Sequence, residues 1–166
     1  MEIERKFLIP DISKINLNLD DYKHKTIQQD YLYVDSLTAI RKRKIVTDDN
    51  TTCYYTIKTG KKGISVNEIE NEIDNLMYAK LQVNPKYNSI IKERYLIPYV
   101  DNLTIELDIF KGIYGGIAFA EIEYKDENQV NQIKLPEWFG KEISTLVTNS
   151  DMAIKSSKVI FDILQK

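Results

Sequence analysis

Most of this chain alternates polar and apolar residues with a period of two, which is the pattern of β-strands that bury one face. Eight segments follow it and are rich in Ile, Val, Thr, Tyr or Phe. They cover residues 2–9, 25–34, 38–46, 52–59, 64–73, 88–97, 103–110 and 117–124. Helices are predicted only over residues 11–17, 75–83 and 151–164. A parallel plan would need a helix after nearly every strand, so we expect an antiparallel fold, α+β or all-β.

Two of the predicted helices carry specific expectations. The helix over the middle of the chain would bring Leu76, Met77 and Val83 to one apolar face. The C-terminal helix has Ser150 or Asp151 as its N-cap, since their side chains accept hydrogen bonds from the first free N–H groups.

Composition narrows the class of protein. The 166 residues fit one domain spanning 1–166, and 23 Lys and Arg against 25 Asp and Glu argue against a general nucleic-acid binder. One cysteine, Cys53, and one histidine, His24, exclude an intramolecular disulfide, a cysteine zinc cluster and a multi-histidine metal site. The charged N-terminus and the lack of long apolar runs predict neither a secretory signal nor a membrane span. We therefore expect a cytoplasmic protein.

The charges are sorted by strand, with like charges two residues apart on one face. Acidic faces carry Glu2 and Glu4, Glu68 and Glu70, Glu106 and Asp108, and Glu121 and Glu123. Basic faces carry Arg41 and Arg43, and Lys92 and Arg94, to which Lys6 and Lys58 add. Two like charges about 4 Å apart repel by roughly 4 kcal/mol at an effective dielectric near 20, so a bound partner of opposite charge would relieve them.

Two interpretations of these faces remain. In the simpler one, the sheet is half exposed and its charged faces meet water. In the other, the eight acidic and six basic side chains share one cavity, which one or two divalent cations would make neutral or positive. Oxygen-only ligands suit Mg²⁺ or Mn²⁺, and paired arginines match phosphate oxygens. This second interpretation predicts a site for a small polyanion held with metal.

Motifs at these faces form a collinear series from residue 2 to about residue 150. They are E-x-E-x-K at 2–6, Q-x-Y-L at 29–32, R-x-R at 41–43, T-x-K at 56–58, E-x-E at 68–70, K-x-R-Y at 92–95, E-x-D-x-F at 106–110 and A-E-x-E at 120–123. The series resembles the CYTH superfamily, also called triphosphate tunnel metalloenzymes. One departure is Val66, because family members usually carry an arginine two residues before the fifth strand's E-x-E. The absence of this arginine would shift the substrate range or weaken activity.

The resemblance implies a fold and a set of roles. The fold is a closed eight-stranded antiparallel β-tunnel with a charged interior and a few covering helices, an α+β class dominated by β-structure. The implied metal ligands for Mg²⁺ or Mn²⁺ are Glu2, Glu4, Asp108, Glu121 and Glu123. The implied phosphate-binding residues are Lys6, Arg41, Arg43, Lys58, Lys92 and Arg94. Lys6 and Glu70 are the catalytic candidates, and Glu68 and Glu106 support them. Glu68 and Glu70 would either orient the attacking water or hold basic side chains in place.

The implied activity is metal-dependent hydrolysis of a small-molecule triphosphate, inorganic tripolyphosphate or a nucleoside triphosphate, with release of the terminal phosphate. The alternatives are an adenylate cyclase of the same superfamily, which makes cyclic AMP from ATP, a thiamine triphosphatase, and a non-catalytic domain that binds polyphosphate or nucleotide.

Overall fold

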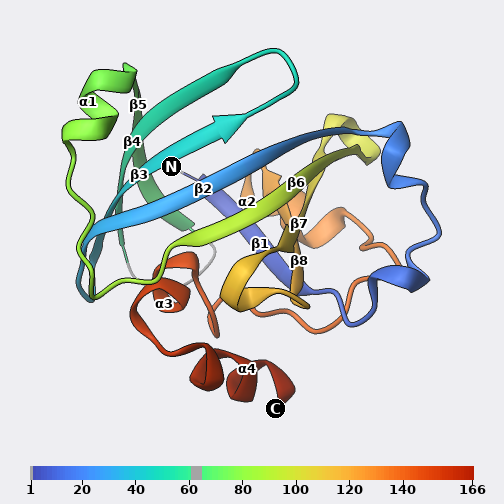
Figure 1. Ribbon diagram of the computed structural model, residues 1–166. Coiled ribbons are helices and arrows are strands. Elements are labelled where there is room, and N and C mark those ends of the chain that lie inside the picture. Colours follow the sequence, from blue (N-terminus) through green and yellow to red (C-terminus); the bar gives the residue numbers. More distant parts are fainter. Residues whose placement is uncertain (1, 61–64) are drawn as a thin grey trace.

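The computed structural model describes residues 2–60 and 65–166, and its main feature is a closed barrel of eight antiparallel strands (Figure 1). Around the barrel the order is β1, β5, β4, β3, β2, β6, β7 and β8, and β8 pairs with β1 again. The strands are β1 (Glu2–Leu8), β2 (Lys23–Val34), β3 (Thr38–Val46), β4 (Thr51–Thr59), β5 (Ser65–Ile73), β6 (Ile90–Pro98), β7 (Thr104–Phe110) and β8 (Ala118–Tyr124). The predicted antiparallel tunnel is confirmed, although Ile64, the expected start of the fifth strand, lies outside the described residues.

Alternation along each strand decides which side chains enter the barrel. On β3, Arg41 and Arg43 line the interior cavity. Lys42, between them, faces outward, where its Nζ donates to the backbone carbonyl of Tyr78 at 3.0 Å. Consecutive basic residues of β3 therefore lie on opposite faces of the barrel wall, as a period of two requires.

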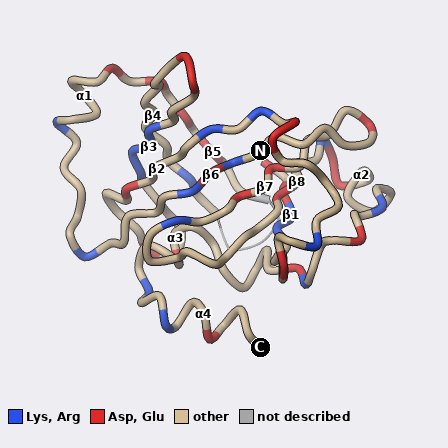
Figure 2. Tube along the Cα trace, turned by 45° about the vertical axis from the view of Figure 1, so that its right-hand side comes forward, with Lys and Arg blue, Asp and Glu red and all other residues tan. Residues whose placement is uncertain are grey.

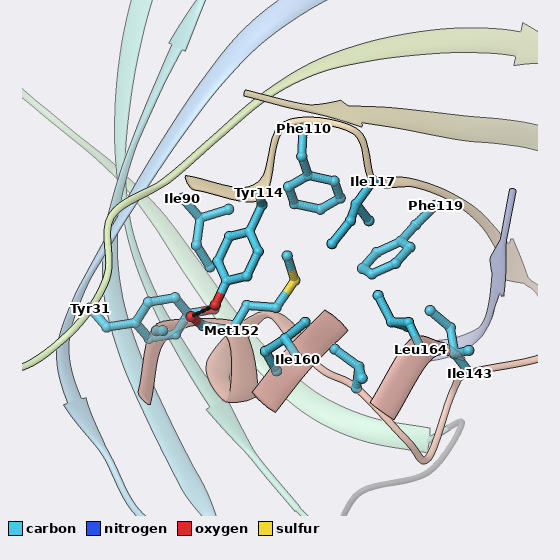
Figure 3. Close-up of a cluster of buried hydrophobic side chains, with 12 residues drawn as sticks. Tyr31, Ile90, Phe110, Tyr114, Ile117, Phe119, Ile143, Met152, Ile160 and Leu164 are labelled. Carbon is cyan, nitrogen blue, oxygen red and sulfur yellow. Dashed lines mark hydrogen bonds between the residues drawn. The ribbon is translucent and has the colours of Figure 1, made fainter. Parts of the chain in front are cut away.

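The apolar outer faces are covered by helices and loops. At one end of the barrel, α3 (Asn149–Ile154) packs against β2 and β6, and α4 (Ser157–Gln165) follows it (Figure 1). Figure 3 shows Met152 of α3 extending toward Tyr114, whose hydroxyl donates to the Met152 carbonyl at 2.5 Å. Both residues belong to a buried apolar cluster, with Ile160 and Leu164 of α4, that holds the C-terminal segment against the barrel.

A second buried cluster lies on the outer faces of β7 and β8. Ile105 and Ile122, which are paired across these two strands, pack there with Ile15 from the N-terminal connection. The shorter elements of the chain are the 3₁₀-helices η1 (Ile12–Lys14), η2 (Leu19–Asp21), η3 (Val100–Asn102) and η4 (Gly112–Tyr114), and the helices α1 (Asn75–Lys80) and α2 (Glu127–Gln132). None of the described helices has the length and apolar character needed to cross a membrane.

The helices differ most from the sequence-based expectations. The helix predicted over residues 11–17 is only the single 3₁₀ turn η1. The helix predicted over 75–83 ends at Lys80, and its expected apolar face is wrong, since Leu76 and Met77 are 65% and 49% exposed and Val83 lies beyond it.

The C-terminal helix predicted over 151–164 is two helices, separated at Lys155 and Ser156. Neither Ser150 nor Asp151 is the N-cap. Thr148 caps α3 in a reciprocal box with Asp151, and the Ser156 hydroxyl accepts from the Val159 N–H to begin α4. The break lies at Ser156, because the N-cap of α4 has an extended backbone that cannot continue α3.

Candidate functional site

The barrel interior holds a cavity of about 510 Å³ with mostly charged walls. Figure 2 shows basic and acidic positions along the strands that surround it. In barrel order, the charged residues that line it are basic on β4, β3, β2 and β6 and acidic on β7, β8, β1 and β5. Its charged lining residues come from all eight strands: Glu2, Glu4, Lys25, Arg41, Arg43, Lys58, Glu68, Glu70, Arg94, Glu106, Glu121 and Glu123. The sorted charges thus meet inside one cavity, and the simpler interpretation of a half-exposed sheet does not describe this protein.

Two arginines of β3 form the basic wall of the cavity. Arg41 and Arg43 are 5% and 8% exposed, and the Nε atom of each is buried without a hydrogen-bond partner in the described part of the chain. Burial, together with the nearby charges of Arg41 and Arg94, lowers the pKa of Arg43 to about 10. A multivalent anion would pair these guanidinium groups and relieve their mutual repulsion.

Glu70 supports this wall from β5. Its Oε2 accepts from the Thr56 hydroxyl at 3.0 Å and lies 3.5 Å from Nη1 of Arg43. These contacts match the second of the two roles expected for Glu70, holding a basic side chain in place.

Lys58 bridges two carboxylates at another part of the wall. Its Nζ lies 3.4 Å from Glu2 and 3.4 Å from Glu68. Burial and a hydrogen bond with Glu68 raise the pKa of Glu2 to about 9. The pKa of Glu68 falls to about 2, because the hydrogen bond from Glu2 and the charges of Lys58 and Arg41 outweigh its burial. Without a ligand, the pair therefore shares one proton.

Asp108 and Lys92 do not line the cavity. Both are fully buried, with the Lys92 Nζ donating to Asp108 at 2.6 Å. Arg94 donates to the same carboxylate through Nε at 2.6 Å and Nη2 at 2.7 Å. Burial would raise the pKa of Asp108, but Arg94 and Lys92 lower it. From the sequence we expected Asp108 to bind metal and Lys92 to bind phosphate. In the structure these two side chains pair with each other and with Arg94, and it is Arg94 that lines the cavity.

Glu121 is also engaged by cations. Its Oε1 lies 3.5 Å from the Lys6 Nζ and 3.8 Å from Nη2 of Arg94. Burial opposes ionisation, but Lys6 and Arg94 hold the pKa of Glu121 well below its ordinary value. Glu106, whose side chain is 33% exposed, also forms an ion pair with Arg94.

Glu4 and Glu123 are the carboxylates best placed for a cation. They face each other in the β1–β8 register and both line the cavity. Burial and the charges of Glu106 and Glu4 raise the pKa of Glu123. Across residues 2–60 and 65–166, no three Asp, Glu, His or Cys side chains form a complete metal cluster. The donor set fits a hard cation such as Mg²⁺ or Mn²⁺, which takes one or two carboxylates and completes its shell with phosphate oxygens and water.

A second compartment of about 400 Å³ adjoins the first. The two share Glu4, Arg41, Lys58 and Asn149 in their walls. Beyond these shared residues the walls become more apolar, and they include Tyr31, Val34, Leu37, Ala39, Val66 and Ile154. Lys6 lines this compartment, not the larger one.

Sequence reasoning assigned no role to five lining residues: Lys25, Gln29, Ile45, Tyr54 and Asn149. Lys25 and Gln29 share the inner face of β2, so alternation alone was a sufficient signal for them. Tyr54 likewise shares a face with Lys58. Asn149 carries no such signal, because it reaches the cavity only through the folding of α3 across the barrel end.

The sequence matches the family model of the CYTH domain over residues 1–154. It is 33% identical, over 147 residues, to a protein of Acetivibrio thermocellus named inorganic triphosphatase. That alignment covers 86% of this chain and 85% of the relative.

Solved structures show the same architecture. The crystal structure of the inorganic triphosphatase NE1496 superposes with a TM-score of 0.62 at 26% identity, covering 93% of this chain and 95% of that one. A Hippeastrum protein described as a putative adenylyl cyclase with a dominant triphosphatase activity gives a TM-score of 0.63 at 19% identity, covering 79% and 83% of the two chains. At that identity the second likeness concerns the fold alone.

Proposed function

The chain belongs to the CYTH domain family, and from this premise we propose that it hydrolyses a triphosphate, releasing the terminal phosphate, with inorganic tripolyphosphate as its main substrate. The observation that carries the proposal is the pair of buried guanidinium groups, Arg41 and Arg43, that face a cavity lined on its other walls by carboxylates. This is the charge distribution that a phosphate chain bound with a divalent cation requires.

Five basic residues bind the phosphate chain. Arg41 and Arg43 donate hydrogen bonds to phosphoryl oxygens, while Arg94, whose nitrogens already pair with Asp108 and Glu106, acts with Lys58 and Lys6 mainly through its charge. Lys6 lines the second compartment, so it adds positive charge at the end of the phosphate chain that lies on that side. These groups are held in position before substrate arrives, which is how a site stabilises charge that develops during phosphoryl transfer.

The remaining members of the expected set keep those cations in place. Asp108 and Lys92 fix Arg94 from behind, Glu121 fixes Lys6, and Glu70 fixes Arg43. Each contact restricts a long side chain to one geometry, so the basic groups meet the phosphates in line for displacement.

Glu4 and Glu123, with Glu2 and Glu106 beside them, would hold the Mg²⁺ or Mn²⁺. When bound, the cation supplies neutralisation of phosphoryl charge and a coordinated water of lowered pKa. Carboxylates repel phosphates, so the terminal phosphoryl group would approach the acidic wall only together with the cation. Glu68, which stays ionised beside Lys58, would accept a hydrogen bond from the attacking water.

The test is phosphate release from tripolyphosphate by the purified chain, with Mg²⁺, with Mn²⁺ and with excess EDTA. We expect release with at least one metal and none with EDTA. A protein that releases no phosphate from tripolyphosphate with either metal would refute the proposal.

The second compartment favours one other substrate class, a triphosphate that carries an organic group. Its apolar residues, among them Tyr31, Val34 and Val66, suit a ring system better than phosphate. Comparing kcat/KM for tripolyphosphate, ATP and thiamine triphosphate decides between the classes. With ATP, chromatography separates hydrolysis, which yields ADP and phosphate, from cyclisation, which yields cyclic AMP and pyrophosphate.

Val66→Arg tests the compartment directly. The added charge should favour tripolyphosphate over the organic triphosphates. An unchanged ratio of kcat/KM values would show that this wall does not select the substrate.

A further inference from the structure

Gln29 is a buried polar side chain whose hydrogen-bonding groups are unused. It is 0% exposed, it lines the charged cavity, and neither Nε2 nor Oε1 has a hydrogen-bond partner in the portion of the chain that the structure covers. Buried side-chain amides in native proteins are nearly always paired, because an unpaired polar group loses its hydration without compensation. An amide left open on a cavity wall indicates a ligand that completes it.

The neighbouring glutamine shows that the strand itself does not cause this. Gln28 is on the outer face of β2, where its Nε2 donates to Asp30 at 3.1 Å. Gln29 faces the opposite way and lies between its register partners Arg43 on β3 and Ile90 on β6. Its open amide is therefore on the strand position beside Arg43, whose Nε is also buried without a hydrogen-bond partner in the described residues.

An uncharged donor is well suited to this position. Burial and the nearby like charges of Arg41 and Arg94 already lower the pKa of Arg43, even with Glu70 beside it. A further lysine or arginine on β2 would increase that repulsion, whereas an amide N–H adds a donor without adding charge. Lys25, on the same face of β2, also has a lowered pKa, from burial and from the charge of Arg94.

We propose that Gln29 contacts the substrate directly, with its Nε2 donating to a phosphoryl oxygen of the triphosphate that Arg43 binds. This deepens the proposed function and rests on it. The amide completes a row of donors across two adjacent strands, so that a phosphoryl group at this point meets both a charged and a neutral donor.

The experiment compares Gln29→Met with the matched control Gln28→Met. Methionine preserves the length of the side chain and removes both hydrogen-bonding groups. Three quantities are measured: kcat/KM for tripolyphosphate with metal, the melting temperature without ligand, and the rise in melting temperature caused by tripolyphosphate without metal. For Gln29→Met we expect kcat/KM to fall about ten- to hundredfold, the value of a hydrogen bond to a charged group.

The ligand-free melting temperature separates this role from a structural one. It should be unchanged or higher in Gln29→Met, because two unpaired buried atoms are removed, while the rise caused by tripolyphosphate becomes smaller. Gln28→Met should keep the wild-type kcat/KM. A wild-type kcat/KM in Gln29→Met would overturn the proposal, and so would a lower ligand-free melting temperature with an undiminished tripolyphosphate shift.

Gln29→Glu provides a second variant in case Gln29→Met does not fold. It keeps the shape of the side chain but presents an anion to the phosphate, so its kcat/KM should fall further, and wild-type activity would overturn the proposal. If the wild type binds tripolyphosphate but releases no phosphate, the proposed hydrolysis fails, while the difference in thermal shift between wild type and Gln29→Met still decides whether Gln29 contacts the phosphates.

Discussion

Asp108→Asn should lower the free energy of unfolding by about 3–5 kcal/mol, the range for breaking a buried ion pair from one side. Asp108 is 0% exposed and accepts three hydrogen bonds from Lys92 and Arg94, at 2.6–2.7 Å. Asparagine has the same shape but no charge, and its amide group opposes one of these donors. Two buried cations then lose their shared counter-ion, and water cannot replace it.

The expected loss is large compared with the total stability of a domain, about 5–15 kcal/mol. For a chain of this length, each kcal/mol lowers the melting temperature by about 2–4 °C, so a fall of about 6–20 °C is expected. Urea denaturation followed by circular dichroism gives the free energy, and calorimetry gives the temperature.

The double variant Lys92→Met/Asp108→Asn tests the electrostatic reasoning. Removing one cation together with the anion restores the local charge balance, so the double variant should be more stable than Asp108→Asn alone. The reasoning is refuted if Asp108→Asn costs less than about 1 kcal/mol. It is also refuted if the two substitutions simply add.

Three further outcomes follow from the structure. Arg41→Ala should lower kcat/KM for tripolyphosphate about tenfold to a hundredfold for each hydrogen bond lost, whereas Lys44→Ala, on the outer face of the same strand, should leave it unchanged. Ile160→Ala should cost about 2–5 kcal/mol in urea denaturation, because Ile160 is fully buried between α4 and the barrel. Glu142→Gln should cost less than about 1 kcal/mol at pH 7, since the ion pair with Arg5 is partly exposed. The hydrogen bond from Arg5 lowers the pKa of Glu142, so its stabilising effect is present above pH 4.5 and the difference from wild type should vanish as the pH falls below that value.

The strands and their faces could be predicted because one rule, the period of two, fixes both. Four like-charged pairs of the sequence, Glu2 with Glu4, Arg41 with Arg43, Glu68 with Glu70 and Glu121 with Glu123, line the cavity from one side of their strands. The same rule does not determine how far a side chain reaches into the barrel. It places Asp108 on the inner face but cannot tell a side chain that reaches the cavity from one that is used in pairing behind it, since that depends on the side chains of neighbouring strands.

The helices were harder to predict because their packing is tertiary. Leu76 and Met77 have helical spacing, yet α1 leaves them exposed. The polar helix α2 was missed for lack of an apolar stripe, although a local signal existed: Asp126 caps it by accepting from the N–H of Gln129, and Gln129 reaches back to Lys125.

The closed barrel also determines how the chain must fold. Ile3 of β1 pairs with Tyr124 of β8, so most of the β1 ladder, beyond its short pairing with β5, forms only when β8 is in place. Such distant pairing is costly in chain entropy and places folding in the millisecond-to-second range. Until closure, β1 remains an open edge, and alternating charges on an edge discourage pairing with other chains. Glu4 and Lys6 would thus discourage aggregation of the unfinished barrel before they take their places in its walls.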